Sequence, residues 1–210
     1  MRGRTDRTDR GQTFTLEAFV AAILLLATVA FALQVVAVSA NTADQGDVEI
    51  AAQHSGLAQG VLDEATANGS LESTVLYWNE TREEFHHADD HEDGYYVARA
   101  PPTEFGDELG AMFDGRQVRY NVDLYFVTED GGRAHQRLVE SGTPSEDAVR
   151  VTETVVLFDN TTLVDDNESA RTETLANVSA DEDASFYAPD ANPDSPVYNV
   201  VRVEVVLWRT

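Results

Sequence analysis

An uninterrupted apolar run near the N-terminus constrains this chain more than any other feature. Residues Ala18–Ala40 include no charged side chain. A helix of this length would be about 35 Å long, because each residue adds roughly 1.5 Å. The hydrocarbon core of a bilayer is about 30 Å thick. The run therefore predicts one transmembrane helix. A buried core helix of a soluble domain is the weaker reading, since no other stretch of this acidic chain resembles it.

The flanks of the apolar run predict its orientation in the membrane. Four arginines precede it: Arg2, Arg4, Arg7 and Arg10. Basic residues are enriched on the cytoplasmic side, so we expect a cytoplasmic N-terminus and an extracellular chain from Asn41 onward. A cleavable secretory signal is an alternative, because Val38–Ala40 offers the small residues of a cleavage site. The run is longer than the apolar core of an ordinary signal peptide.

The composition is strongly acidic. The formal net charge is −24, from 14 basic and 38 acidic residues. Every basic residue is arginine, and the chain contains no lysine. High salt would screen the resulting self-repulsion, so we expect a protein of salt-rich, halophilic surroundings. The acidic exterior argues against nucleic acid or an anionic lipid surface as a partner. No cysteine is present, which excludes disulfides, thiolate nucleophiles and cysteine-based metal sites.

Composition and periodicity divide the chain into four predicted segments. They are an arginine-rich cytoplasmic leader (1–17), the transmembrane helix (18–40), an amphipathic helix (41–70) and an acidic extracellular α+β domain (71–210). Apolar residues recur at helical spacing over Val48–Ala67. Within the last segment, residues 160–196 are rich in turn-forming residues and predict a long surface loop.

Alternating apolar residues predict a strand-rich domain. The expected strands are Ser73–Trp78, Tyr95–Arg99, Gln117–Thr128, Arg133–Glu140, Ala148–Asp159 and Tyr198–Trp208. Residues Thr103–Phe113 predict a short helix capped by Thr103. The expected fold class is therefore α+β: an N-terminal transmembrane helix extends into an amphipathic helix, which packs on a mostly antiparallel β-sheet.

The first forty residues resemble type IV pilin-like proteins of archaea. The resemblance rests on the arginine-rich leader, Gly11-Gln12, the segment Thr13–Glu17 and the apolar run that follows. It implies a pilin-like fold, cleavage by a prepilin peptidase at Gly11 or Gln12, and pairing of Glu17 with the N-terminal amine of a like or related subunit. A cut after Gly11 makes Glu17 the sixth mature residue, and a cut after Gln12 makes it the fifth, its usual position in the family. The remaining chain is similar to an uncharacterised extracellular domain of halophilic archaea.

Glu17 also has a simpler interpretation. A carboxylate at the edge of an apolar helix can extend into the membrane interface without any subunit contact. The residue alone does not decide between the two roles.

One segment has the composition of a metal site. Residues 83–93 contain three histidines and six carboxylates. Imidazole and carboxylate can bind a divalent cation, but a segment of this kind between two strands is more typical of a solvated loop. No nucleophile elbow, phosphate-binding loop, dinucleotide fingerprint or HExxH motif is present. We therefore expect no enzyme activity and no cofactor.

Five N-x-Ser/Thr motifs lie beyond the apolar run, on the side expected to be extracellular. Their asparagines are Asn68, Asn79, Asn160, Asn167 and Asn177. All fall at predicted turns or loops, so they are candidate glycosylation sites.

Three functions fit these features. The favoured one is a membrane-anchored, non-enzymatic surface protein that acts as a pilin-like or minor-pilin structural subunit. The alternative is an uncleaved single-pass envelope protein whose extracellular domain binds a partner. A membrane-anchored hydrolase using the histidine-rich segment is the least supported, because no convergent catalytic groups are visible.

Overall fold

The computed structural model describes Glu49 and residues 51–210. Ala51–Thr210 form one compact unit. The predicted leader, the predicted transmembrane helix and the residues Gly11, Gln12 and Glu17 lie outside the described part of the chain. Among the described residues, no helix has the length and apolar character needed to cross a membrane.

The centre of the domain is a five-stranded sheet in the order β3-β5-β4-β9-β6. Its strands are β3 (Tyr96–Val97), β4 (Val118–Val127), β5 (Arg133–Glu140), β6 (Val149–Phe158) and β9 (Val197–Arg209). Three of its four pairings are antiparallel, and only β3 runs parallel to β5. The structure thus confirms an α+β fold with a mostly antiparallel sheet. The long alternating strands were predicted from the sequence to within one or two residues at each end.

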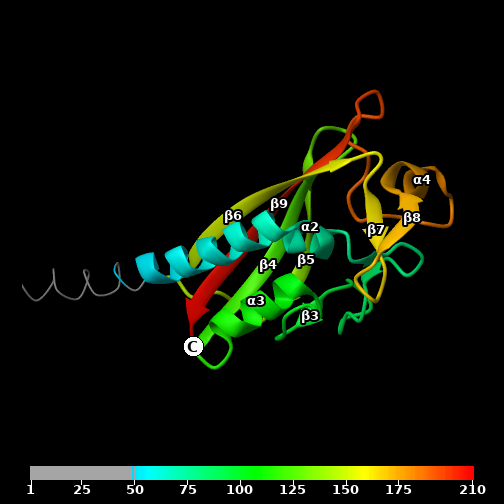
Figure 1. Ribbon diagram of the computed structural model, residues 1–210. Coiled ribbons are helices and arrows are strands. Elements are labelled where there is room, and N and C mark those ends of the chain that lie inside the picture. Colours follow the sequence, from blue (N-terminus) through cyan, green and yellow to red (C-terminus); the bar gives the residue numbers. More distant parts are fainter. Residues whose placement is uncertain (1–48, 50) are drawn as a thin grey trace, which may run out of the picture. The chain divides into compact units, whose positions relative to one another are not determined.

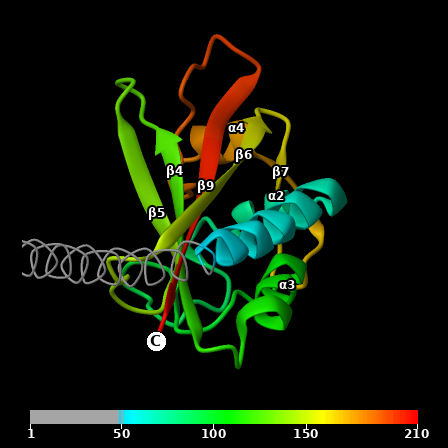
Figure 2. The same cartoon turned by 90° about the vertical axis from the view of Figure 1, so that its left-hand side faces the viewer.

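Helices cover one face of the sheet. The chain is helical over residues 51–68, and this helix lies beside α2 (Ser70–Val75) and α3 (Glu104–Phe113) (Figure 1 and Figure 2). Ala58, Leu62 and Ala65 of the first helix are buried in the same core as Val203 and Val205 of β9. Their three- and four-residue spacing explains the burial, because it places them on one side of the helix. The predicted amphipathic helix is confirmed over the described residues.

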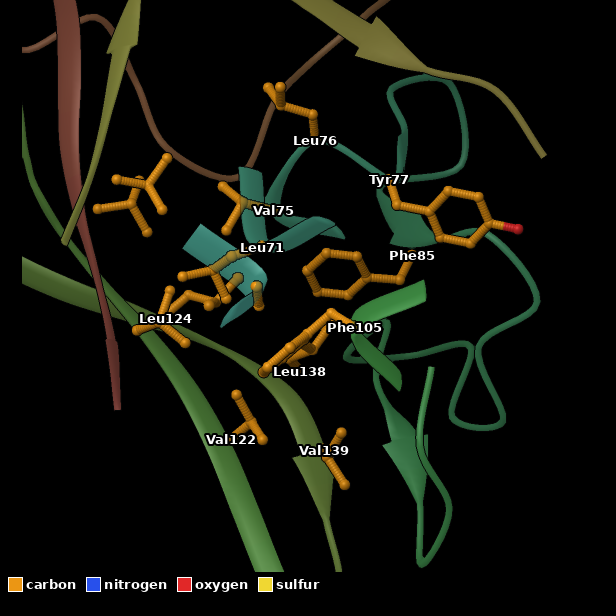
Figure 3. Close-up of a cluster of buried hydrophobic side chains, with 14 of the residues drawn as sticks. Leu71, Val75, Leu76, Tyr77, Phe85, Phe105, Val122, Leu124, Leu138 and Val139 are labelled. Carbon is orange, nitrogen blue, oxygen red and sulfur yellow. The ribbon is translucent and has the colours of Figure 1, made fainter. Parts of the chain in front are cut away.

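The core continues beneath the short helices. Leu71 of α2 and Phe105 of α3 are buried in one cluster with Phe85, Leu124 and Leu138 (Figure 3). The helix α3 begins at Thr103, as the sequence predicts, because the Thr103 hydroxyl accepts a hydrogen bond from the Gly106 amide.

A connection crosses the opposite face of the sheet. Residues 141–148 lead from β5 to β6, which lie on either side of β4 and β9 in the sheet order. Asn121 of β4 fixes the start of this connection: its side chain accepts from the Ser141 amide at 2.7 Å and donates to the Gly142 carbonyl at 2.9 Å. The Asn121 side chain is only 5% exposed, and both its oxygen and its nitrogen have hydrogen-bond partners.

The predicted strand Ser73–Trp78 is wrong. Residues Ser70–Val75 form the helix α2, and only Trp78–Asn79 are extended, as the two-residue strand β1. Gly69 has a φ of 82°, which interrupts the preceding helix and lets the chain begin another. Leu71 and Val75 are four residues apart and both are buried. A short apolar run has no clear period, so its sequence does not distinguish a strand from a buried helix.

The long loop predicted over residues 160–196 is wrong in its first half. This region contains β7 (Thr162–Val164), β8 (Ala170–Thr174) and α4 (Leu175–Ala180). β7 and β8 form a two-stranded antiparallel sheet. These elements form a lobe that lies at the far end of the domain from residue 51 (Figure 1). Four buried apolar residues stabilise it: Leu163, Val164, Leu175 and Val178.

Candidate functional site

The histidine-rich segment forms an ordered loop. β1 pairs with β2 (Glu84–Phe85), and the turn between them is closed by Asn79, whose side-chain oxygen accepts from the Thr81 and Arg82 amides. Phe85 is fully buried and fixes the loop to the core. Gly94 has a φ of 74°, and a Cβ there would lie 2.8 Å from the Glu84 Cα. The backbone of this segment is therefore held by packing and by hydrogen bonds.

The three histidines of this loop serve different contacts. His91 Nδ1 lies 2.7 Å from the Glu84 carboxylate, which is 7% exposed. His86 is half-buried with its ring centroid 4.9 Å from that of Tyr77. Burial lowers the pKa of His86 and favours its neutral form. His87 is exposed. Within residues 51–210, no three metal-ligating side chains gather at one point.

The loop faces a hollow of about 590 Å³. Glu92 and Asp93 line one side, and His135 of β5 lines another. Trp78 and Tyr187 contribute aromatic surface. Gln136 holds the loop against β5, because its side-chain amide donates to the Asp93 carbonyl at 2.7 Å. Residues more than forty positions apart in sequence therefore share one concave surface.

The hollow has a negative lining. Arg137 also lines it, but its guanidinium is bound to Asp123 at 3.1 Å and to Glu140 at 3.0 Å. Burial opposes the charge of Arg137, while these hydrogen bonds raise its pKa and keep it ionised. The other carboxylates of the lining, those of Glu83, Glu92 and Asp93, repel anions and favour a cationic group. Ser185 donates to Glu83 at 3.2 Å, whereas a nucleophilic serine needs a general base such as histidine within hydrogen-bond reach.

The predicted glycosylation sites are not equivalent in the structure. Asn68 donates to the Glu108 carboxylate at 2.8 Å, and Asn79 closes the turn before β2. Asn160 is exposed in the turn after β6, and Asn177 lies within α4. Asn167 is exposed in the loop between β7 and β8. The structure therefore brings three of the five motifs to the lobe formed by β7, β8 and α4.

The sequence does not predict the residues that complete the hollow. Trp78 lies in the predicted strand Ser73–Trp78, and His135 and Arg137 lie in the predicted strand Arg133–Glu140. Neither prediction places these residues beside the acidic loop. Their contact with the acidic loop depends on the parallel pairing of β3 with β5. A two-residue strand carries no periodic signal, so the sequence offered no indication of this neighbourhood.

The fold and the hollow define a helix-covered α+β domain with an acidic concave surface. The chain belongs to a family of unknown function (DUF7288), whose model matches residues 10–207. Comparisons with curated proteins and with solved structures found no match.

Proposed function

We propose that this protein is a membrane-anchored, non-enzymatic surface protein of salt-rich surroundings, and that it is a pilin-like or minor-pilin structural subunit. The observation that carries the proposal is the helix over residues 51–68, whose apolar side covers a mostly antiparallel sheet. A helix of this kind at the N-terminal end of a sheet domain is the arrangement that the pilin resemblance implies.

The apolar run supports the anchor. Residues 18–40 carry no charge and are long enough to span a bilayer. The match to the family begins at residue 10 and so includes this run. The run is therefore part of the region that members of the family share with this chain, which is expected if anchoring belongs to their common function.

The protein's own N-terminus tests the subunit hypothesis. A pilin-like subunit is cut at Gly11 or Gln12, so N-terminal sequencing of the protein from isolated membranes should give a chain that starts at Gln12 or Thr13. A chain that starts at Met1 or Arg2 would contradict processing by a prepilin peptidase.

The acidic hollow favours one alternative. An uncleaved single-pass envelope protein needs a surface that can bind an extracellular partner, and the hollow beside Glu92, Asp93 and His135 is such a surface. Its carboxylates would select a cationic group on that partner. An intact leader on the membrane form would favour this alternative over the subunit.

A further inference from the structure

We propose that Asn167 is the principal site at which this protein is N-glycosylated, and that Asn68 remains unmodified. The inference rests on the proposed extracellular position of the domain. The motif at Asn167 consists of Asn167, Glu168 and Ser169, and all three residues are exposed in the loop between β7 and β8. A transferase can therefore reach the acceptor amide and the serine hydroxyl together without unfolding the domain.

The fold does not depend on the acceptor side chain at this position. The side-chain nitrogen of Asn167, Nδ2, donates to the neighbouring Asp166 carboxylate at 2.8 Å. The loop is held instead by Asp165, which accepts from the Asn167 and Ser169 backbone amides, and by Glu168, which accepts from the Glu104 amide at the start of α3. A glycan on Asn167 leaves all of these contacts in place.

Asn68 is the opposite case. Its side chain both donates to Glu108 and accepts from the Ser70 amide at 2.9 Å. The hydroxyl residue of its motif, Ser70, is only 4% exposed. A transferase acting on the folded domain cannot reach that hydroxyl.

Asn177 is also a poor acceptor in the folded domain. It lies in α4, where Val178 is buried and the Ser179 hydroxyl is hydrogen-bonded to the Tyr198 hydroxyl at 2.6 Å. The motif is therefore part of a packed helix, and its serine hydroxyl is already engaged by Tyr198. Asn160 is exposed, but Thr161 and Thr162 beside it are half-buried.

The reaction transfers a sugar from an activated donor. A bond forms between Nδ2 of Asn167 and the anomeric carbon of a saccharide that carries a phosphate leaving group. The bond from that carbon to the phosphate oxygen breaks, the phosphate leaves with the electron pair, and the amide proton passes to a base. The required donor is thus a glycosyl phosphate ester of the kind carried on a membrane lipid.

Peptide masses from the full-length protein, purified from membranes of its native cells, test this proposal. The chain has no lysine, so trypsin cuts only after arginine, and Val151–Arg171 contains both Asn160 and Asn167. We expect this peptide to carry a glycan mass in the natural protein. Ser169→Ala should remove that mass, whereas Ser169→Thr, which preserves the motif, should retain it.

Two results would overturn the inference: a bare Val151–Arg171 peptide, or a glycan mass that Ser169→Ala leaves unchanged. The N-terminal sequence of the same preparation is read independently. A chain that starts at Gln12 or Thr13 with a bare peptide refutes glycosylation alone. A glycosylated peptide on a chain that starts at Met1 refutes the pilin-like subunit alone.

Discussion

Thr103 connects two helices through a single hydroxyl group. Its Oγ1 caps α3 and also lies 2.7 Å from the Thr74 hydroxyl of α2, and both side chains are buried. Thr103→Ala should lower the free energy of unfolding by about 1–3 kcal/mol, since it removes the cap and leaves the Thr74 hydroxyl without this partner. Urea unfolding followed by circular dichroism measures the change.

Thr103→Ser is the matched control for this prediction. It keeps the hydroxyl and should retain most of the stability. Equal losses in the two variants would show that the methyl group of Thr103 matters and that its hydrogen bonds do not.

The ion pair between Glu80 and Arg171 makes the stability of the lobe formed by β7, β8 and α4 depend on pH. The Glu80 carboxylate is bound by Arg171 of β8, and the two side chains are 12% and 27% exposed. Burial alone would raise the pKa of Glu80. The hydrogen bond from Arg171, a backbone hydrogen bond and the charge of Arg171 together outweigh burial, so the pKa lies below its usual range. The ionised carboxylate therefore stabilises the fold above the pKa of the unfolded chain, and this contribution is lost as the pH falls through the folded pKa.

The variant Glu80→Gln isolates this contribution. At pH 7 it should be about 1 kcal/mol less stable than the natural protein, and the difference should shrink between about pH 5 and pH 3. Unfolding at fixed salt concentration across this pH range measures it. A difference that grows on acidification would have the wrong sign for a carboxylate with a lowered pKa.

At the scale of elements, two helical glycines should respond oppositely to the same substitution. A Cβ at Gly60, in the helix over residues 51–68, would meet nothing within 4 Å. At Gly106 of α3 it would lie 1.8 Å from the Pro101 carbonyl oxygen. Gly60→Ala should raise the free energy of unfolding by about 0.5–1 kcal/mol, because alanine favours a helix. Gly106→Ala should lower it by about 2–3 kcal/mol through overpacking.

Each glycine variant serves as the control for the other, since both replace a helical glycine by alanine. Thermal unfolding of the described domain reports the sign of each change. Stabilisation by both variants would show that α3 does not pack closely against Pro101.

The strands that the sequence predicted well carry an alternating segment within a long apolar-rich stretch. Apolar and polar residues alternate over Val118–Leu124 of β4 and Val201–Val205 of β9, and both strands are central in the sheet. The errors fall where a few residues become ordered only through tertiary contacts. α2 depends on Leu71 and Val75 reaching the core, and the β7–β8 pair depends on buried Leu163. The secondary-structure propensities of single residues do not include such tertiary contacts.

The candidate site was also predictable only in part. The acidic loop and the five glycosylation motifs are local sequence patterns, so the sequence predicts them. The sequence does not predict the β5 side of the hollow, because the Gln136–Asp93 contact joins residues 43 positions apart. The sequence also does not show which glycosylation motif a transferase can reach. The exposure of Asn167 and the burial of Ser70 depend on how the domain packs.

At the scale of the whole molecule, charge should govern stability. The net charge is −24. The excess carboxylates repel one another more strongly in the compact folded state than in the expanded unfolded chain. Added salt screens this repulsion, because the Debye length falls from about 10 Å at 0.1 M to about 3 Å at 1 M. The free energy of unfolding should therefore rise as KCl increases from 0.1 M to above 1 M. Thermal unfolding at several salt concentrations measures the trend, and a melting temperature that stays constant or falls would contradict it.

The central claim is that the domain over residues 51–210 faces the outside of the cell. The absence of natural cysteines allows a direct measurement with a single introduced cysteine. Asn192 is exposed in the domain. In intact cells, a membrane-impermeant maleimide should label the Asn192→Cys variant and leave the natural, cysteine-free protein unlabelled. Labelling of Asn192→Cys only after the cells are broken would contradict the claim.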